Sequence, residues 1–444
     1  MRWILGTVSI LIIGILFQLG FLVYSTYVLL GILLISRWLT HQWAAGITAY
    51  RSPNPPRAEL GETLDFAFSI ENRGQLRVSW LLFEDSLPHQ AMERIPPALV
   101  LKGKRPLGLR ELEPGEAYEA HYQLTFNQRG YYQIGPLLIE TGDLFGLHRT
   151  FRIITDPNYV LVRPKVIPLR DYQLASRRPV GEVKIAHRLF EDPTRIAAVR
   201  PFQPGDSLNQ IHWRATARTG VFHSRVYENS CVAGATLVLD FHDLGYEGSG
   251  AHVTRELAVT VAASLANTVF ESGNQVGLVT NGRDAAERIK HTGAQGEFKT
   301  RKAAQTMATS TVDNDRRSPI VVPTRKGADQ MSQILDTLGR LEPGSGLNFS
   351  ELLQEASHLL PRDATVIPIL RDVSEETALS LGMLRNRGFA IHVIFVQFDE
   401  GYQPSWAKAP SWAEPIVAQG IDFMTVANED DLRSLFNREH PAKL

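Results

Sequence analysis

Hydrophobic and polar positions follow three different patterns along the chain, and each pattern predicts a different kind of structure. Residues 3–36 contain no Asp, Glu, Lys, Arg or His. Residues 63–74 and 118–126 alternate apolar and polar side chains, which indicates strands buried on one face. From about residue 233, short apolar runs alternate with helical periodicity. The pattern therefore predicts a membrane segment, an antiparallel β region and an α/β region.

The first apolar run is long enough for two short membrane helices. One span needs about 20 apolar residues, whereas this run has 34. We expect a transmembrane helical hairpin over residues 1–45, with a turn near 18–20. One long tilted helix is an alternative. A secretory signal peptide cleaved near 44–46 is another, although signal peptides have an apolar region of only about 7–15 residues.

Positive charges flank this run. Arg2 precedes it and Arg37 and Arg51 follow it, whereas the expected turn carries no charge. Because Lys and Arg concentrate on the cytoplasmic side, a two-span hairpin places both of its ends in the cytoplasm. We therefore expect a protein of the inner (cytoplasmic) membrane that contacts the lipid bilayer through the hairpin, with its soluble domains facing the cytoplasm.

The rest of the chain divides into three regions. Turn residues separate the strands over residues 46–168, as in a small β-sandwich. Residues 169–232 hold a basic linker and a signature segment. We expect the linker to be a solvated connector; the alternative is that it contacts anionic lipid. Residues 233–444 predict a mostly parallel, Rossmann-type sheet covered by helices. Its expected strands lie at 235–240, 276–280, 365–370, 389–396 and 421–426, and its expected helices at 253–270, 328–341, 349–360 and 428–436.

Composition excludes several function classes. The chain has 46 basic and 47 acidic residues, a formal net charge of -1, so its bulk charge does not attract nucleic acid. The single cysteine, Cys231, excludes an intramolecular disulfide framework and a cysteine-rich zinc site. No GxxxxGK[ST] sequence occurs, so any ATP chemistry must lie in a partner.

Two aspartates, Asp240 and Asp372, follow predicted strands, where open α/β sheets bind ligands. This region resembles a von Willebrand factor A-like domain, whose metal site uses Asp-x-Ser-x-Ser, a Thr from a mid-domain loop and a second Asp. Here His242 and Leu244 replace the serines, and Leu347 replaces the threonine. Because Mg²⁺ requires near-octahedral oxygen ligation, we expect a degenerate site without a cofactor, with Mg²⁺ binding as the alternative.

The stretch 200–228 concentrates charged and aromatic residues. One interpretation is an intramolecular clasp, in which Arg214 and Arg218 grip Asp206 or Glu228 around a tryptophan. The other is a docking surface, since Trp and Arg are enriched at binding hot spots. No nucleophile has an evident base and orienting group, so we expect no enzyme, a hydrolase using Asp206 and His212 being a distant alternative. The candidate residues are Arg200, Gly205, Asp206, Ile211, Trp213, Arg214, Arg218 and Glu228.

The same stretch resembles the signature of a bacterial family of uncharacterised membrane proteins, domain-of-unknown-function family fifty-eight. Residues 190–193 and 129–147 are similar to the family's upstream segments. The resemblance implies a partner, because members are typically encoded beside MoxR-type AAA+ ATPases and are thought to work with them in assembling or maturing protein complexes. We therefore expect a non-enzymatic, membrane-anchored scaffold, with an outward-facing adhesion protein as the alternative. The matching positions are Arg200, Phe202, Gly205, Asp206, Ile211, Trp213, Ala217, Arg218, Tyr227 and Glu228.

Overall fold

The chain divides into two compact units, each with its own hydrophobic core. The β unit comprises residues 1–165, 283–316 and 335–343, and the α/β unit comprises residues 166–282, 317–334 and 344–444. The computed structural model describes residues 2–143, 145–146, 148–169, 191–203, 211–229, 234–243, 251–288, 296–298, 300–309, 318–362, 364–397 and 414–435.

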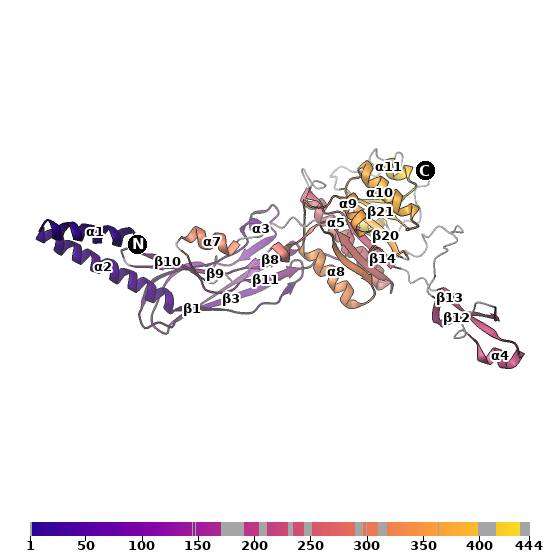
Figure 1. Cartoon of the computed structure of the whole chain (residues 1–444), viewed down its shortest axis with the longest axis horizontal. Coiled ribbons are helices and arrows are strands. Elements are labelled where there is room, and N and C mark those ends of the chain that lie inside the picture. The colour runs from indigo at the N-terminus through magenta and orange to yellow at the C-terminus, as the bar shows by residue number, and fades with distance from the viewer. Residues whose placement is uncertain are drawn as a thin grey trace. The chain divides into compact units, whose positions relative to one another are not determined.

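Two apolar helices begin the β unit (Figure 1). Helix α1 (Arg2–Leu16) and helix α2 (Gly20–Gly46) are joined by a turn in which Gln18 has a φ of 54°. The expected pair of helices and the place of their turn are therefore confirmed. Helix α2 is long and apolar enough to cross a membrane, whereas the 15 residues of α1 extend over about 22 Å.

Helix α2 continues directly into the first strand, β1 (Ile47–Arg51). Trp43 and Ile47 at this junction are 5% and 2% exposed and belong to the core of the β unit. The end of the helix is therefore anchored by the same apolar packing that holds the sheets.

In the described part of the chain, three sheets of three to five strands make up most of the rest of the β unit. In β3 the alternation seen in the sequence buries every second side chain, and the rings of Phe68 and Phe83 meet across the core with centroids 5.8 Å apart. The expected strands at 63–74 and 118–126 are confirmed. The sheet orders are β1-β3-β7-β5, with β3 (Thr63–Asn72), β7 (Ala117–Phe126) and β5 (Leu99–Lys102); β17-β10-β9-β4-β6, with β17 (Gly296–Phe298), β10 (Arg149–Ile153), β9 (Leu137–Gly142), β4 (Val78–Asp85) and β6 (Leu107–Leu112); and β2-β11-β8, with β2 (Arg57–Ala58), β11 (Asn158–Val162) and β8 (Gly130–Ile134). Helix α3 covers His89–Glu93.

Two later stretches of the chain, 283–316 and 335–343, belong to the β unit, although the sequence analysis placed them in an α/β domain over 233–444. Strand β17 pairs antiparallel with β10, and helix α7 (Arg301–Thr309) packs Ala304 against the same sheet. By pairing with β10, strand β17 supplies hydrogen-bond partners for backbone groups along an edge of β10 that would otherwise be unpaired. The remaining elements here are β16 (Arg283–Asp284), α6 (Ala285–Arg288) and β19 (Leu341–Glu342).

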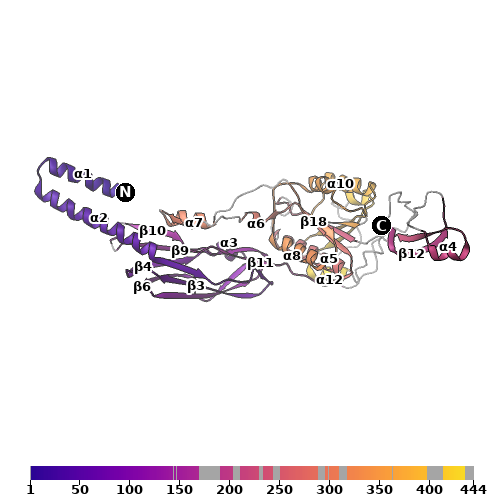
Figure 2. The same ribbon diagram turned by 60° about the horizontal axis from the view of Figure 1, so that its bottom comes forward.

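The α/β unit is built on a six-stranded sheet. Figure 1 labels its strands β14, β20 and β21, and Figure 2 labels β18 with helices α5, α8, α10 and α12. Neighbouring strands are parallel except at the edge strand β18, which is antiparallel to β15. The five expected strands are confirmed, although β21 begins at His392, after a turn in which Gly388 has a φ of 92°. The order is β18 (Ile320–Arg325), β15 (Gln275–Thr280), β14 (Gly234–Leu239), β20 (Ala364–Leu370), β21 (His392–Val396) and β22 (Asp422–Val426).

The helices of this unit follow the expected pattern with two additions, α10 (Glu375–Asn386) and α11 (Glu414–Ala418). Asn428 caps the last helix, since its Oδ1 accepts a hydrogen bond from the Asp431 backbone N–H at 2.7 Å. Helix α10 was not expected, and Ser374 caps it by accepting a bond from Thr377 N at 3.1 Å. The helices are α5 (Ala251–Glu271), α8 (Ala328–Arg340), whose residues 335–340 belong to the β unit, α9 (Phe349–Ala356), α10 (Glu375–Asn386), α11 (Glu414–Ala418) and α12 (Glu429–Leu435).

Candidate functional site

The order of the six strands reverses between β14 and β20, because the chain adds β15 and β18 on one side and β20, β21 and β22 on the other. In open α/β sheets ligands bind outside the carboxyl ends of the strands at such a point. Asp240 follows β14 and Asp372 lies just beyond β20. Asp372 is exposed, and its Oδ1 accepts a bond from the neighbouring Val373 N at 2.7 Å.

Asn281, directly after β15, links three segments at this place. Its Nδ2 donates to Oδ1 of Asp240 at 2.8 Å and to the carbonyl of Leu347 at 3.0 Å. Its Oδ1 accepts a bond from Phe241 N at 2.6 Å. Burial raises the pKa of the Asp240 carboxyl, against the opposing effect of the hydrogen bonds from Asn281 and the His242 backbone. Asn281 was not among the residues expected from the sequence.

The loop that resembles the threonine-bearing loop of the von Willebrand factor A-like family lies against the end of β14. Gly344 pairs with His242 in a parallel bridge, and Gly344 N donates to Phe241 O at 3.2 Å. Leu347 contributes its backbone carbonyl to Asn281, whereas Leu244 lies outside the described residues. Among the residues that the structure describes, no group of three or more His, Cys, Asp or Glu side chains could hold a metal ion.

The signature segment forms a hairpin with one short helix. Strands β12 (Glu191–Pro201) and β13 (His223–Asn229) are antiparallel, and α4 (Trp213–Thr219) lies between them in the sequence. His212 caps α4, because its Nδ1 accepts a bond from Ala215 N at 3.0 Å. A backbone hydrogen bond joins this capping residue to β13, because His212 N donates to His223 O at 2.8 Å. Ile211 bridges to Ser224 and is 5% exposed.

Near the hydrogen bond between His212 and His223, the hairpin exposes large apolar and cationic side chains. Trp213, Val221 and Phe222 are 64%, 59% and 54% exposed. Arg214 and Arg218, four residues apart on α4, are also exposed. We call these five residues the hairpin surface.

Several predicted residues cannot be placed. Gly205 and Asp206 lie outside the described residues, as do residues 170–190 with most of the basic linker. The backbone of Glu228 lies in β13, and its side chain is not described. The pairing of Arg214 or Arg218 with Asp206 or Glu228 therefore stays a prediction.

A buried polar network in the β unit was missed by the sequence analysis. Arg51, which the sequence analysis counted among the positive charges flanking the membrane segment, forms a two-pronged ion pair with Asp85 inside the core. The hydroxyl of Tyr122 donates to the same carboxylate. Burial and the Asp85 carboxylate raise the pKa of Tyr122. The network connects β1, β4 and β7, so its chemistry is structural.

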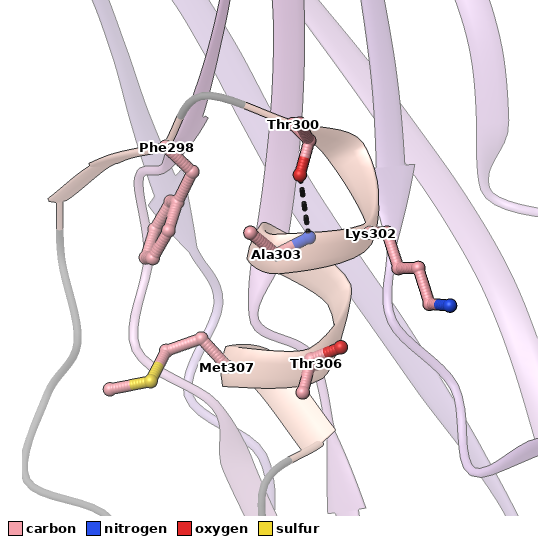
Figure 3. Close-up of a pocket in the computed structure, with 6 residues that line it drawn as sticks. All are labelled: Phe298, Thr300, Lys302, Ala303, Thr306 and Met307. Carbon is pink, nitrogen blue, oxygen red and sulfur yellow. Dashed lines mark hydrogen bonds between the residues drawn. The ribbon is translucent and has the colours of Figure 1, made fainter.

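A surface pocket lies on helix α7 (Figure 3). Thr300 caps the helix by accepting a bond from Ala303 N at 3.1 Å. Lys302 extends away from Phe298 and is the one ionisable side chain among the described residues of the lining. These described residues offer no pair of groups for acid–base or nucleophilic chemistry.

Comparison with known proteins relates one part of the chain to a family of unknown function. The model of the family described as "Protein of unknown function DUF58" matches residues 198–319. "Uncharacterized protein YeaD" of Bacillus subtilis (strain 168) is 25% identical over 165 residues, 37% of this chain and 39% of the relative. The alignment thus spans less than half of that relative. Both matches support a relation to the DUF58 family.

Solved structures resemble parts of the chain. Proximal thread matrix protein 1 from the mussel byssus is 12% identical with a TM-score of 0.28, over 46% of this chain and 46% of that chain. An aerotolerance-related membrane protein from Bacteroides fragilis is 12% identical with a TM-score of 0.26, over 47% of this chain and 98% of that chain.

Proposed function

We propose that the protein is a non-enzymatic, membrane-anchored scaffold that works with a MoxR-type AAA+ ATPase in the assembly or maturation of protein complexes. The hairpin surface carries the proposal, because Trp213, Val221 and Phe222 are large, exposed and apolar and stand beside exposed arginines. Trp and Arg supply much of the binding energy at protein interfaces. The family match over 198–319 includes this surface.

The charge around the surface specifies the chemistry of the partner. Between Arg200 and Arg225 the sequence has four arginines and one acidic residue, Asp206. Complementary charge speeds association and suppresses wrong partners. The docking site on the ATPase is therefore an apolar patch with an acidic rim.

The α/β unit of this scaffold is a von Willebrand factor A-like domain without a metal ion. Its strand order, with β14 central and the third strand antiparallel at the edge, supports this assignment. The Asn281 amide N–H groups point at Asp240 and Leu347, and an N–H donor cannot ligate a cation. The β unit is a β-sandwich whose two larger sheets face one core.

The scaffold lies in the inner membrane with two spans and has its soluble units in the cytoplasm. Arg2 and Arg37 flank the apolar helices, and the turn between these helices has no charge, as the positive-inside rule requires for this orientation. A reporter fused to the carboxyl end tests the side. Reporter activity on the outer face would favour an adhesion protein instead.

Affinity capture tests the partner. The full-length protein is captured from detergent-solubilised membranes as wild type, as the double variant Arg214→Glu and Arg218→Glu, and as the charge-matched control Arg362→Glu and Arg387→Glu, whose arginines are exposed elsewhere in the α/β unit. Mass spectrometry should find the AAA+ ATPase with the wild type and the control, and lose it with the hairpin variant. Equal recovery with all three proteins, or no ATPase with the wild type, would refute the proposal.

A further inference from the structure

The turn between β9 and β10 exposes an aromatic side chain. Asp143, 3% exposed, accepts bonds from Phe145 N at 3.1 Å and from His148 N at 2.6 Å. Gly146 adopts a φ of 69°, a conformation that glycine takes without steric penalty. Phe145 is nevertheless 69% exposed. A turn held in one shape by a buried carboxylate therefore presents a phenyl ring to its surroundings.

This turn lies beside helix α2, as Figures 1 and 2 show for the β9–β10 end of the sheet. Arg152 on β10 donates a hydrogen bond to the carbonyl of Ala44 on α2. From Ala44 back to Arg37 the helix rises about 10 Å, and from Arg152 back to Arg149 the strand extends about 10 Å. The turn is thus level with Arg37.

Electrostatics agree with this placement. Burial lowers the pKa of His148, and the charge of Arg37 lowers it further, against the opposing effect of the Asp143 carboxylate. Arg37 is therefore close enough to the turn for its charge to act on it.

The same level marks the end of the apolar part of α2. Residues 20–36 contain no Asp, Glu, Lys, Arg or His and extend over about 25 Å, close to the hydrocarbon thickness of a bilayer. Arg37 and Trp38 follow, and both are exposed. Basic and aromatic side chains of this kind gather at the headgroups of a membrane.

We infer that the β9–β10 turn is a membrane-interface contact, in which Phe145 inserts among the headgroups of the bilayer that holds α1 and α2. Arg37 attracts anionic phospholipid headgroups to the same place. The side chain of Arg149 is 58% exposed but pairs with Glu140 at 3.2 Å, so Arg37 supplies the main positive charge. The turn thereby gives the β unit a second attachment besides α2 and limits its tilt on the membrane. This inference rests on the proposed insertion of the helical hairpin.

Depth-dependent fluorescence quenching tests the contact in the full-length protein. Cys231→Ser removes the single native cysteine, and single cysteines are then introduced as Phe145→Cys, Val28→Cys and Ile95→Cys for labelling with an environment-sensitive dye. Val28 is 64% exposed in the apolar part of α2 and reports insertion of the helix. Ile95 is 96% exposed and precedes Leu99, which pairs with Phe126 at the end of β7 far from α2, so it serves as the exposed apolar control.

The labelled proteins are placed in phosphatidylcholine nanodiscs with and without phosphatidylglycerol, each carrying spin-labelled lipids. We expect headgroup-depth quenchers to act several-fold more strongly at position 145 than at 95, more so with phosphatidylglycerol, and Arg37→Gln to remove the effect of that lipid. Core-depth quenching at 28 with no difference between 145 and 95 would overturn the inference alone. No quenching at 28 would overturn membrane insertion as well. Shielding of 145 only in native membranes, and not in nanodiscs, would assign the turn to a protein partner and overturn the lipid contact.

Discussion

Asn281 donates a hydrogen bond from Nδ2 to Oδ1 of Asp240 across 2.8 Å, at the point where the order of the strands reverses. Two of the groups that donate hydrogen bonds to this carboxyl group are neutral, the Asn281 amide and the His242 backbone N–H at 3.3 Å. Neutral hydrogen bonds compensate a buried charge less fully than an opposite charge does. Burial accordingly raises the pKa of Asp240.

The raised pKa of Asp240 predicts that Asp240→Asn increases the free energy of unfolding at neutral pH. A carboxyl whose pKa is higher in the folded state than in the unfolded state makes the folded state bind more protons. The wild type therefore loses stability as pH rises from the unfolded value, about 3.9, through the raised folded value. Asn does not titrate, so its advantage should be absent in acid and grow as pH rises. Urea unfolding over a pH series measures this difference, and a variant less stable at neutral pH would contradict it.

The hydrogen bond between Asn281 and Asp240 predicts that Mg²⁺ does not stabilise the protein. A ligand present at a hundred times its Kd would add about 2.7 kcal/mol to the folded state. For each protein, the wild type and Asp240→Asn, we expect the melting temperature in millimolar Mg²⁺ to equal that in EDTA. A rise with Mg²⁺ that both Asp240→Asn and Asp372→Asn abolish would instead establish a metal site.

The hairpin surface predicts a separation of binding from stability. Trp213→Ala changes a side chain that is 64% exposed, so its effect on the free energy of unfolding should stay within about 0.5 kcal/mol while capture of the ATPase is lost. Ile211→Ala, at a residue 5% exposed, should cost about 2–5 kcal/mol. Chemical unfolding and capture are measured on both variants. Normal capture by a folded Trp213→Ala protein would exclude this residue from the interface.

Limited proteolysis separates docking from the clasp. If Arg218 closed a clasp between domains, Arg218→Ala would speed cleavage between about residues 168 and 233. Because Arg218 is exposed on α4, we expect cleavage as slow as in the wild type. Faster cleavage would restore the clasp interpretation.

Local pattern explains which parts of the fold could be predicted. Strand β3 could be predicted from the sequence alone. Its apolar and polar side chains alternate, and the apolar ones are buried because one face of the strand packs on the core. Strand β17 has three residues, Gly296–Phe298, and exists through pairing with the distant β10. A pairing between distant segments leaves no local periodicity in the sequence. Residues 283–316 and 335–343 could therefore not be assigned to the β unit from the sequence.

The candidate site was predictable to the same extent. Asp240 and Asp372 were found because both follow strands and ligands bind there. Asn281 follows the predicted strand at 276–280 and would have been found by applying the same rule to every strand. The partnership of Arg51 with Asp85 gave no such signal, since charge alone does not show which arginine is buried.

The buried network predicts a large difference between single and paired substitutions. Asp85→Ala leaves the Arg51 guanidinium buried without its partner, which should cost about 3–5 kcal/mol. Tyr122→Phe removes one hydrogen bond to the carboxylate and should cost about 1.5–3 kcal/mol. The double variant Arg51→Met and Asp85→Leu removes both charges and should lose less stability than Asp85→Ala alone. Urea unfolding of the full-length variants measures all three, and a double variant weaker than Asp85→Ala would show that the ion pair is worth more than its burial costs.

The close approach of Gly135 to Arg51 predicts a matched pair of glycine substitutions. Gly135 has a φ of 88°, and a Cβ there would lie 2.6 Å from Nη2 of Arg51. Gly115 has a similar φ of 80° with nothing within 4 Å. Both Ala substitutions carry the left-handed backbone cost of about 1–2 kcal/mol, but Gly135→Ala must also displace a guanidinium whose two-pronged bond to Asp85 holds it in place.

We therefore expect Gly135→Ala to lose at least about 2 kcal/mol more than Gly115→Ala, because the displaced arginine would leave buried charges imperfectly paired. In the Arg51→Met and Asp85→Leu background the ion pair that resists displacement is absent, so the excess should shrink. Denaturant unfolding of the four proteins measures the coupling. An excess that stays the same in both backgrounds would place the cost of Gly135→Ala in the backbone and not in the contact with Arg51.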